Sequence, residues 1–326
     1  MNVLVVGLGS MGKRRIRLML QVEESLNIIG VDSNEERCTE IEHNYGIKCY
    51  KSLEDALKQN TFDCSFVCTA PLSHSRIIIE LLNKGINVFT EINLVSDHYQ
   101  QIIDLAKNRE KTVFLSSTFL YRKDIQYIIN RVQSHRVNYQ YHSGQYLPDW
   151  HPWEDYNNFF VADKKTNGCR EILTIELPWI IKCFGKISKW YVLKDKMSNL
   201  RLDYNDNYLI MLEHENGNRG QIIVDIVSRL ARRNLEVYGE DLQLFWGGAP
   251  DSLKEYFIDT KETKKIGTYE EISRIAGYCD NIIENAYLDE IITFFAQIQG
   301  DASKEVMYDL NRDIDVLNII DKIEEI

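Results

Sequence analysis

Three closely spaced glycines near the start of the chain constrain its fold more than any other feature. They lie between an apolar run at 2–6 and an amphipathic segment at 13–22. In a strand–loop–helix unit of this kind, the first glycine permits a tight turn and the second lets the backbone approach a pyrophosphate. The third allows the helix to pack closely on the strand. The predicted phosphate-binding loop comprises Gly7, Gly9, Ser10, Met11 and Gly12.

An acidic residue ends the next apolar run. The run at 27–31 predicts a second strand, and Asp32 follows it at about 20 residues from the glycine loop, the spacing of a dinucleotide-binding fingerprint. A carboxylate there accepts hydrogen bonds from both hydroxyls of an adenosine ribose and repels a 2′-phosphate. We therefore predict NAD as the cofactor and disfavour NADP. Arg37 is the nearby residue that would favour NADP instead.

Strands and helices alternate through the first third of the chain. Apolar runs at 64–68 and 87–90 are interleaved with helical patterns at 74–84 and 97–108. Strands separated by helices predict right-handed crossovers and a parallel sheet covered on both faces. Residues 1–118 are therefore predicted to form an α/β Rossmann domain with a doubly wound parallel sheet.

The pattern changes after Thr118. Apolar and polar residues alternate in consecutive runs at 137–142, 190–193, 206–214, 220–228, 234–238 and 242–246. Tight connections between such runs are typical of an antiparallel or mixed sheet, and 287–326 is helical in pattern. We predict that residues 119–326 form a C-terminal α+β domain with a large, mostly antiparallel open sheet for substrate binding and oligomerisation.

Composition and charge exclude several classes of protein. A net charge of −11 disfavours a nucleic-acid binder, which needs a basic face. No apolar stretch reaches the roughly 18 residues that span a bilayer, so no membrane partner is expected. The 7 cysteines and 7 histidines show no disulfide or metal-ligand spacing. The first apolar run begins at residue 2 without a charged region before it, so we expect a cytoplasmic protein without a bound metal.

Motifs outside the glycine loop match one known family. They are Thr69-Ala70-Pro71 with His74, Glu91, Arg122, Gly217 with Gly220, the segment 235–240, and Tyr287 with Glu290 and Phe294. With them the chain resembles, over nearly its whole length, the Gfo/Idh/MocA oxidoreductases, the glucose–fructose oxidoreductase and inositol dehydrogenase superfamily. The resemblance implies cofactor contacts from Thr69, Ala70, Pro71, His74, Glu91 and Asn93.

The resemblance also implies an activity and a partner. Members of this family are nicotinamide-dependent enzymes that act on sugars, cyclitols or nucleotide sugars. We therefore expect an NAD-dependent oxidoreductase acting on a hydroxyl or carbonyl group of such a small molecule, in carbohydrate metabolism such as surface-carbohydrate biosynthesis. The open sheet of the second domain would form a homodimer or homotetramer interface.

The chain departs from the family at the positions of its catalytic residues. The family's Glu-Lys-Pro motif is Glu-Ile-Asn at 91–93, so its lysine is missing. The second-domain motif of acid, histidine and aspartate is represented by Glu171, Ile175 and Pro178, so only the acid remains. Pro178 lacks a backbone N–H, and we expect the helix here to start late or to kink.

Two residues are candidates for the missing proton acceptor. Glu171 would have Ile175 as an apolar neighbour one helical turn away, which raises the pKa of a carboxyl group. Its alternative role is that of a surface or helix-capping glutamate. His151 is the second candidate because an imidazole titrates near neutrality.

Aromatic and polar residues crowd the segment 144–156, which suits stacking on a sugar or base. The alternative is a long loop fixed to the core by its tryptophans. Two arginines could bind an anion or hydroxyl group, although arginines at such positions often form structural ion pairs. The predicted substrate-binding residues are Arg122, Tyr146, Asp149, Trp150, Trp153 and Arg170.

Three functional hypotheses remain open from the sequence. The first is the NAD-dependent oxidoreductase with a non-standard proton acceptor. The second is a non-catalytic NAD(H)-binding pseudoenzyme or sensor, which the loss of the family's base would explain. The third is a lyase or epimerase in which NAD is recycled without net redox change.

Overall fold

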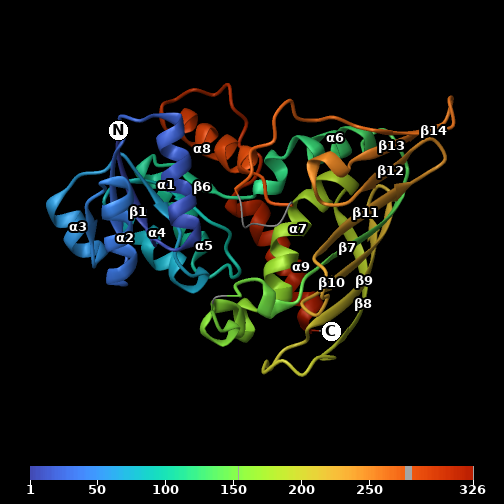
Figure 1. Cartoon of the computed structure of the whole chain (residues 1–326), viewed down its shortest axis with the longest axis horizontal. Coiled ribbons are helices and arrows are strands. Elements are labelled where there is room, and N and C mark those ends of the chain that lie inside the picture. Colours follow the sequence, from blue (N-terminus) through green and yellow to red (C-terminus); the bar gives the residue numbers. More distant parts are fainter. Residues whose placement is uncertain (153, 276–280, 326) are drawn as a thin grey trace. The chain divides into compact units, whose positions relative to one another are not determined.

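Two structural units are present in the computed structural model, which describes residues 1–152, 154–275 and 281–325 (Figure 1). Unit 1 comprises Met1–Thr118 and Ala286–Ile314, and unit 2 comprises Phe119–Asn285 and Asp315–Ile326. None of the described helices combines the length and apolarity needed to cross a membrane.

Unit 1 contains the predicted parallel sheet. Its strands are β1 (Asn2–Val6), β2 (Asn27–Val31), β3 (Cys49–Tyr50), β4 (Cys64–Val67), β5 (Asn87–Thr90) and β6 (Val113–Leu115). They lie in the order β3-β2-β1-β4-β5-β6, and every pairing is parallel. The connecting helices are α1 (Ser10–Val22), α2 (Glu35–Tyr45), α3 (Leu53–Gln59), α4 (His74–Asn83) and α5 (Tyr99–Arg109). The strand order reverses between β1 and β4, where doubly wound folds bind ligands, so the predicted Rossmann fold is confirmed.

A helix from near the end of the chain completes the core of unit 1. Helix α8 (Glu284–Ile298) places Phe294 edge-on to Phe66 and at a steep angle to Phe89, with ring centroids 5.5 and 5.7 Å apart. The sequence analysis predicts that all of 119–326 belongs to the second domain. The structure differs over Ala286–Ile314, because the apolar side chains of α8 are buried against the first sheet.

A buried arginine connects four segments of unit 1. Arg15 on α1 is fully buried, and its Nε donates to Glu91 Oε1 at 2.6 Å while its Nη2 donates to Glu290 Oε2 at 2.8 Å. Its guanidinium carbon lies 4.4 Å from the ring centroid of Phe89. Glu290 Oε1 also accepts the backbone N–H of Ser117 at 2.8 Å. Because a buried guanidinium is tolerated only when it is paired, this network fixes α1, the ends of β5 and β6, and α8 to one another.

Unit 2 is built on an eight-stranded sheet. Its strands are β7 (Asn138–Gly144), β8 (Ile187–Asp195), β9 (Asn207–His214), β10 (Arg219–Asp225), β11 (Arg232–Tyr238), β12 (Gln243–Trp246), β13 (Lys254–Phe257) and β14 (Glu262–Lys265). They lie in the order β14-β13-β12-β11-β7-β10-β9-β8. All pairings are antiparallel except that of β10 with β7. The predicted large, mostly antiparallel sheet is confirmed, although β13 and β14 were not predicted.

Helices lie on one face of this sheet. Figure 1 shows α6 (Lys123–Val132), α7 (Gly168–Phe184) and the end of α9 (Leu310–Glu325) beside the strands on the same side. In the described part of unit 2, no helix covers the opposite face. Tyr191, Leu193 and Met211 on β8 and β9 are 60%, 72% and 62% exposed there. The open sheet expected from the sequence is therefore present.

Helix α7 does not start late, contrary to the sequence expectation. It begins at Gly168 and continues past Pro178, and the side chain of its N-cap Asn167 accepts the backbone N–H of Arg170 at 2.8 Å. Proline inside a helix costs about 3 kcal/mol. Leu173 and Leu177 on this helix are buried, and packing of such apolar residues offsets that cost.

One close contact in unit 2 gives a test of the sheet packing. A Cβ atom at Gly220 on β10 would lie 1.9 Å from the ring of Tyr139. We expect Gly220→Ala to lower the free energy of unfolding by about 1–3 kcal/mol, because the buried ring has to move. Gly267→Ala is the matched control, since a Cβ there meets no atom within 4 Å. Urea denaturation of both variants measures the difference, and equal midpoints would contradict the packing.

Candidate functional site

The glycine loop of unit 1 is shaped by two close approaches and one open position. Gly7 has a φ of +92°, and a Cβ there would lie 2.7 Å from the backbone of Cys68. A Cβ at Gly12 would lie 2.0 Å from the carbonyl oxygen of Gly7. At Gly9, by contrast, the nearest atom belongs to Arg37 at 3.8 Å. The loop therefore leaves its middle glycine accessible, as a backbone that receives a pyrophosphate requires.

Asp32 connects the loop to the end of β2. Its Oδ2 accepts the backbone N–H of Leu8 at 2.8 Å, and its Oδ1 accepts that of Asn34 at 2.9 Å. The guanidinium of Arg37 lies 3.5 Å from Oδ2 and is 47% exposed. The carboxylate is thus held beside the loop, where a ribose is bound in such folds. The exposed guanidinium of Arg37 lies next to it.

A buried polar group lies after β4 and β5. His74 Nδ1 is 2.6 Å from Asn93 Oδ1, and His74 Nε2 is 2.8 Å from the carbonyl oxygen of Thr69. Burial lowers the pKa of His74, so its ring is neutral and carries one N–H. Asn93 is buried, and its Nδ2 has no hydrogen-bond partner among the described residues. A buried amide group without a partner is costly, and a bound ligand would satisfy it.

The other predicted cofactor residues of unit 1 lie close to these groups in sequence. Ser10 and Met11 form the first turn of α1, which contains no acidic residue. Ala70 and Pro71 precede α4, and Pro71 is buried. Glu91 lies at the end of β5, but its carboxylate binds Arg15 in the network described above. The α1 turn and its glycine loop can hold an anion, whereas Glu91 has a structural contact.

Glu171 on α7 is the most unusual acid in unit 2. Burial raises the pKa of its carboxyl group to about 7, and the positive charge of Arg233 partly opposes this rise. Its Oε2 is buried without a hydrogen-bond partner among the described residues. The upward shift has the direction expected from the sequence. A carboxyl group of this kind can donate or accept a proton near neutral pH.

Glu176, five residues further along α7, accepts hydrogen bonds at both of its carboxylate oxygens. Its Oε2 accepts from Tyr141 Oη and from Trp179 Nε1, both at 2.7 Å. Its Oε1 accepts from Arg233 Nε at 2.8 Å. The sequence analysis did not single out Glu176 or Arg233 as a pair. An acid between apolar residues on a buried helix was the available signal, because such a group needs a partner.

Two arginines predicted to contact substrate bind protein groups instead. Arg122 is buried, and its guanidinium pairs with Asp124 at 2.6 Å and donates to the carbonyl oxygens of Gly248 and Asn281. Arg170 pairs with Asp321 at 2.6 Å and with Glu324 on α9. Both have the structural role that the sequence analysis gave as the alternative, because a buried guanidinium has to be neutralised.

The aromatic segment of unit 2 is partly fixed to its surroundings. Trp150 Nε1 donates to the carbonyl oxygen of Gln145 at 3.0 Å. The ring of His151 lies 4.5 Å from that of Phe159, and burial lowers the pKa of this histidine. Glu171 and His151 form no hydrogen bond with each other.

The remaining predicted substrate residues lie around this segment. Tyr146 is half-buried with the guanidinium of Arg229 3.6 Å above its ring, and Asp149 is exposed. Trp153 lies outside the described residues. Among the described residues, no group of three or more histidine, cysteine, aspartate or glutamate side chains could hold a metal ion.

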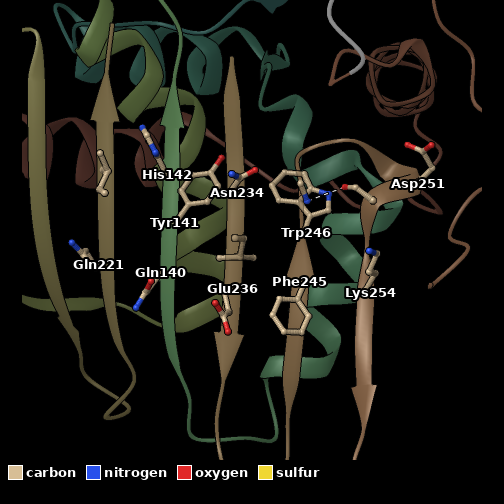
Figure 2. Close-up of a pocket in the computed structure, with 14 residues that line it drawn as sticks. Gln140, Tyr141, His142, Gln221, Asn234, Glu236, Phe245, Trp246, Asp251 and Lys254 are labelled. Atoms are coloured by element: carbon tan, nitrogen blue, oxygen red, sulfur yellow. Dashed lines mark hydrogen bonds between the residues drawn. The ribbon is translucent and has the colours of Figure 1, made fainter. Parts of the chain in front are cut away.

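The uncovered face of the unit 2 sheet is hollowed. Figure 2 shows side chains of β7, β10, β11, β12 and β13 around a hollow of about 690 Å³. His142 in this hollow has its Nε2 2.7 Å from Asp225 Oδ2. The labelled side chains include Gln140, His142, Gln221, Asn234, Glu236 and Phe245. A broad surface that mixes polar and aromatic residues is typical of protein association.

Comparison with known proteins begins with unit 1. Residues 1–117 match the GFO_IDH_MocA family model, described as an oxidoreductase family with an NAD-binding Rossmann fold. Among curated proteins, biliverdin reductase A of Mus musculus is 25% identical over 219 residues, which cover 66% of this chain and 68% of the relative.

Solved structures resemble the whole chain. An inositol dehydrogenase homologue from Azotobacter vinelandii, complexed with NAD+, superposes with a TM-score of 0.81 at 14% identity, covering 100% of this chain and 94% of that one. Biliverdin reductase from Synechocystis, in complex with biliverdin and NADP+, gives 0.75 at 16% identity, covering 99% and 98%. At these identities the likeness establishes the fold of both units.

The raised pKa of Glu171 gives a pH-dependent prediction. Because the folded-state pKa of this carboxyl group is about 7 and the ordinary pKa of glutamate is 4.5, folding disfavours the ionised form. The wild type should therefore lose stability as the pH rises from about 4.5 to 7, by about 3 kcal/mol in total. Glu171→Gln removes this loss.

The measurement is the free energy of unfolding of both proteins at several pH values. The difference in favour of Glu171→Gln should grow between pH 4.5 and 7 and stay level above. The exposed Glu240→Gln is the control and should keep the wild-type profile. A constant difference between Glu171→Gln and wild type would contradict the buried setting of this carboxyl group.

Proposed function

Since residues 1–117 match the family model of the Gfo/Idh/MocA oxidoreductases with an NAD-binding Rossmann fold, we propose that the chain transfers a hydride between NAD and a hydroxyl or carbonyl group of a sugar, cyclitol or nucleotide sugar. The observation that carries this proposal is the glycine loop, which leaves Gly9 open beside the carboxylate of Asp32. The Nδ2 of Asn93, which is buried without a hydrogen-bond partner among the described residues, supports the proposal that a ligand binds near the ends of β4 and β5.

The residues of unit 1 fit a dinucleotide. Gly7, Gly9 and Gly12 would present the first turn of α1 to the pyrophosphate, and Asp32 would accept from the adenosine ribose. Asn93, oriented by His74, would donate to the nicotinamide half through the Nδ2 that lacks a partner. The nicotinamide ring supplies the hydride chemistry.

Glu171 is the residue we propose for proton transfer. When the carbon that carries a sugar hydroxyl loses a hydride, the hydroxyl must lose its proton, and the family's lysine and histidine are absent at 92 and 175. With a pKa of about 7, Glu171 is available in both protonation states at neutral pH. His151 on the aromatic segment would orient the substrate, because packing on Phe159 fixes its ring.

Cofactor binding is the first test. We expect calorimetry of the nucleotide-free protein to show NADH binding at least about tenfold tighter than NADPH, since a 2′-phosphate would meet the carboxylate of Asp32. Asp32→Ala should weaken NADH binding and remove this preference. Arg37→Ala should leave NADH binding nearly unchanged and weaken NADPH binding further. Preference for NADPH by the wild type would contradict the choice of NAD.

Turnover is the second test, with NAD(H) and a panel of sugars, cyclitols and nucleotide sugars. For an active substrate, Glu171→Gln should lower kcat by about 10²–10⁴-fold, the usual contribution of a general acid or base, with little change in KM. His151→Ala should mainly raise KM. Full turnover by Glu171→Gln would reject its assigned role, and NADH binding without turnover of any substrate would favour the sensor.

A second candidate function is reduction of a linear tetrapyrrole. It is favoured by the 25% identity to mouse biliverdin reductase A over 219 residues. Reduction requires a proton donor, and a carboxyl group with a pKa of about 7 can supply one. Biliverdin therefore belongs in the substrate panel, and its NAD(P)H-dependent reduction in place of sugar oxidation would establish this alternative.

The open sheet face is proposed as the interface of a homodimer or homotetramer. Tyr191, Leu193 and Met211 are exposed on it beside the hollow around Gln140 and Glu236 (Figure 2). Exposed apolar side chains of this size are costly to leave in water. Light scattering of the intact protein measures its molar mass, and a monomer at micromolar concentration would contradict the interface.

A further inference from the structure

Two arginines, one in the connection between β10 and β11 and one at the start of β11, have no acidic partner among the described residues. Arg229 and Arg232 are exposed, and neither forms an ion pair or a side-chain hydrogen bond with the part of the chain that the structure describes. Arg233 follows directly and pairs with Glu176. Three guanidinium groups within five residues create a local positive charge on a chain whose net charge is −11.

Asp225 holds this connection in a defined conformation. Its Oδ1 accepts the backbone N–H groups of Val227 and Ser228 at 2.9 and 2.7 Å, and its Oδ2 accepts from Ser228 Oγ at 3.0 Å. The carbonyl oxygen of Ser228 in turn accepts the backbone N–H of Tyr146 at 2.6 Å. The arginine-bearing connection and the aromatic segment are therefore fixed to each other.

Arg229 is positioned by an aromatic ring. Its guanidinium carbon lies 3.6 Å from the ring centroid of Tyr146. A guanidinium that stacks on a ring keeps its in-plane N–H groups available, and their planar arrangement matches a carboxylate or a phosphate. The stacking also limits the side chain's freedom, so less entropy is lost when an anion binds.

The arginine that follows this connection on β11 acts on the proposed proton-transfer residue through its charge. Arg233, four residues after Arg229, is the cation whose charge acts on Glu171. Its guanidinium also lies 5.0 Å from the ring centroid of Phe119, and its Nε is bound to Glu176. Arg233 is thus fixed to Glu176 on α7 directly after the end of the arginine-bearing connection.

We propose that Arg229 and Arg232, with Tyr146 beneath Arg229, bind an acidic group of the substrate, a carboxylate or a phosphate. The inference rests on the proposed function, because it places this group in the substrate and Glu171 at the reacting centre. It narrows the substrate class to anionic molecules, such as an acidic or phosphorylated sugar. A neutral sugar would leave both guanidinium groups without a counter-ion.

Site-resolved chemical protection tests this proposal on the intact protein. Phenylglyoxal modifies accessible arginines, and peptide mass spectrometry measures the rate at each one. The probes are glucuronate, glucose 6-phosphate and glucose, at one ionic strength set with sodium chloride. Arg219 is the internal control, because it is exposed at the opposite end of β10 and has no ion pair in the described chain.

We expect an acidic probe to slow modification of Arg229 and Arg232 by about threefold or more, with Arg219 unchanged and glucose without effect. Protection by glucuronate alone identifies a carboxylate, and protection by glucose 6-phosphate alone identifies a phosphate. Protection by both supports a site for either group. Equal protection by glucose, equal protection of Arg219, or no protection by either acidic probe would overturn the proposal.

Matched variants provide a second measurement. The double substitution Arg229→Gln with Arg232→Gln should weaken binding of the protecting probe by about tenfold in calorimetry, whereas Arg219→Gln should leave it unchanged. Equal affinities for the double variant and wild type would overturn the site. NADH binding is measured on the same preparations. Protection without NADH binding rejects the proposed function alone, and NADH binding without protection rejects the anion site alone.

Discussion

The structure of unit 1, which contains the glycine loop, depends on the burial of one guanidinium group. Arg15 lies on α1 one turn beyond the glycine loop and has no exposed surface. Moving an isolated cation out of water costs several kcal/mol, so the folded state requires Glu91 and Glu290 at their observed places. The position of α1, and with it that of the glycine loop, is therefore set by charge pairing as well as by apolar packing.

A second buried ion pair organises unit 2 in the same way. Glu176 is neutralised by Arg233 and accepts further hydrogen bonds from Tyr141 and Trp179. Glu171 lies on the same helix, its Oε2 has no hydrogen-bond partner among the described residues, and burial raises its pKa. The two glutamates on this helix thus differ in their hydrogen-bond partners, and burial raises the pKa of Glu171.

The fold was largely predictable because its signals are local. The glycine loop, the alternating strands and helices of 1–118 and the period of two in the later strands each depend on neighbouring residues. The strand β14, with the sequence Glu-Thr-Lys-Lys, has no apolar alternation and was missed. The helix α8 was assigned to the wrong unit, because its burial on the first sheet depends on residues more than 200 positions away, such as Phe89.

The candidate site was less predictable for the same reason. Arg122 and Arg170 have residue types suited to binding an anion, but their partners Asp124 and Asp321 are recognised only when burial is known. Arg37 and Asp32 were identified together, because they are close in sequence and follow one strand. Sequence patterns therefore identify neighbours that follow one strand, such as Asp32 and Arg37, better than ion pairs that depend on burial, such as those of Arg122 and Arg170.

One of the two departures from the Gfo/Idh/MocA motifs, Ile175, lies on the same helix as Glu171. Isoleucine at 92 and 175 removes two groups that could carry positive charge, and Ile175 lies one helical turn from Glu171. A cation at 175 would keep this carboxyl group ionised, whereas an apolar side chain favours its protonated form. On α7, an apolar side chain at 175 in place of an imidazole thus accompanies a raised pKa at Glu171. Under the proposed function, proton transfer has moved from an imidazole to a carboxyl group that titrates in the same range.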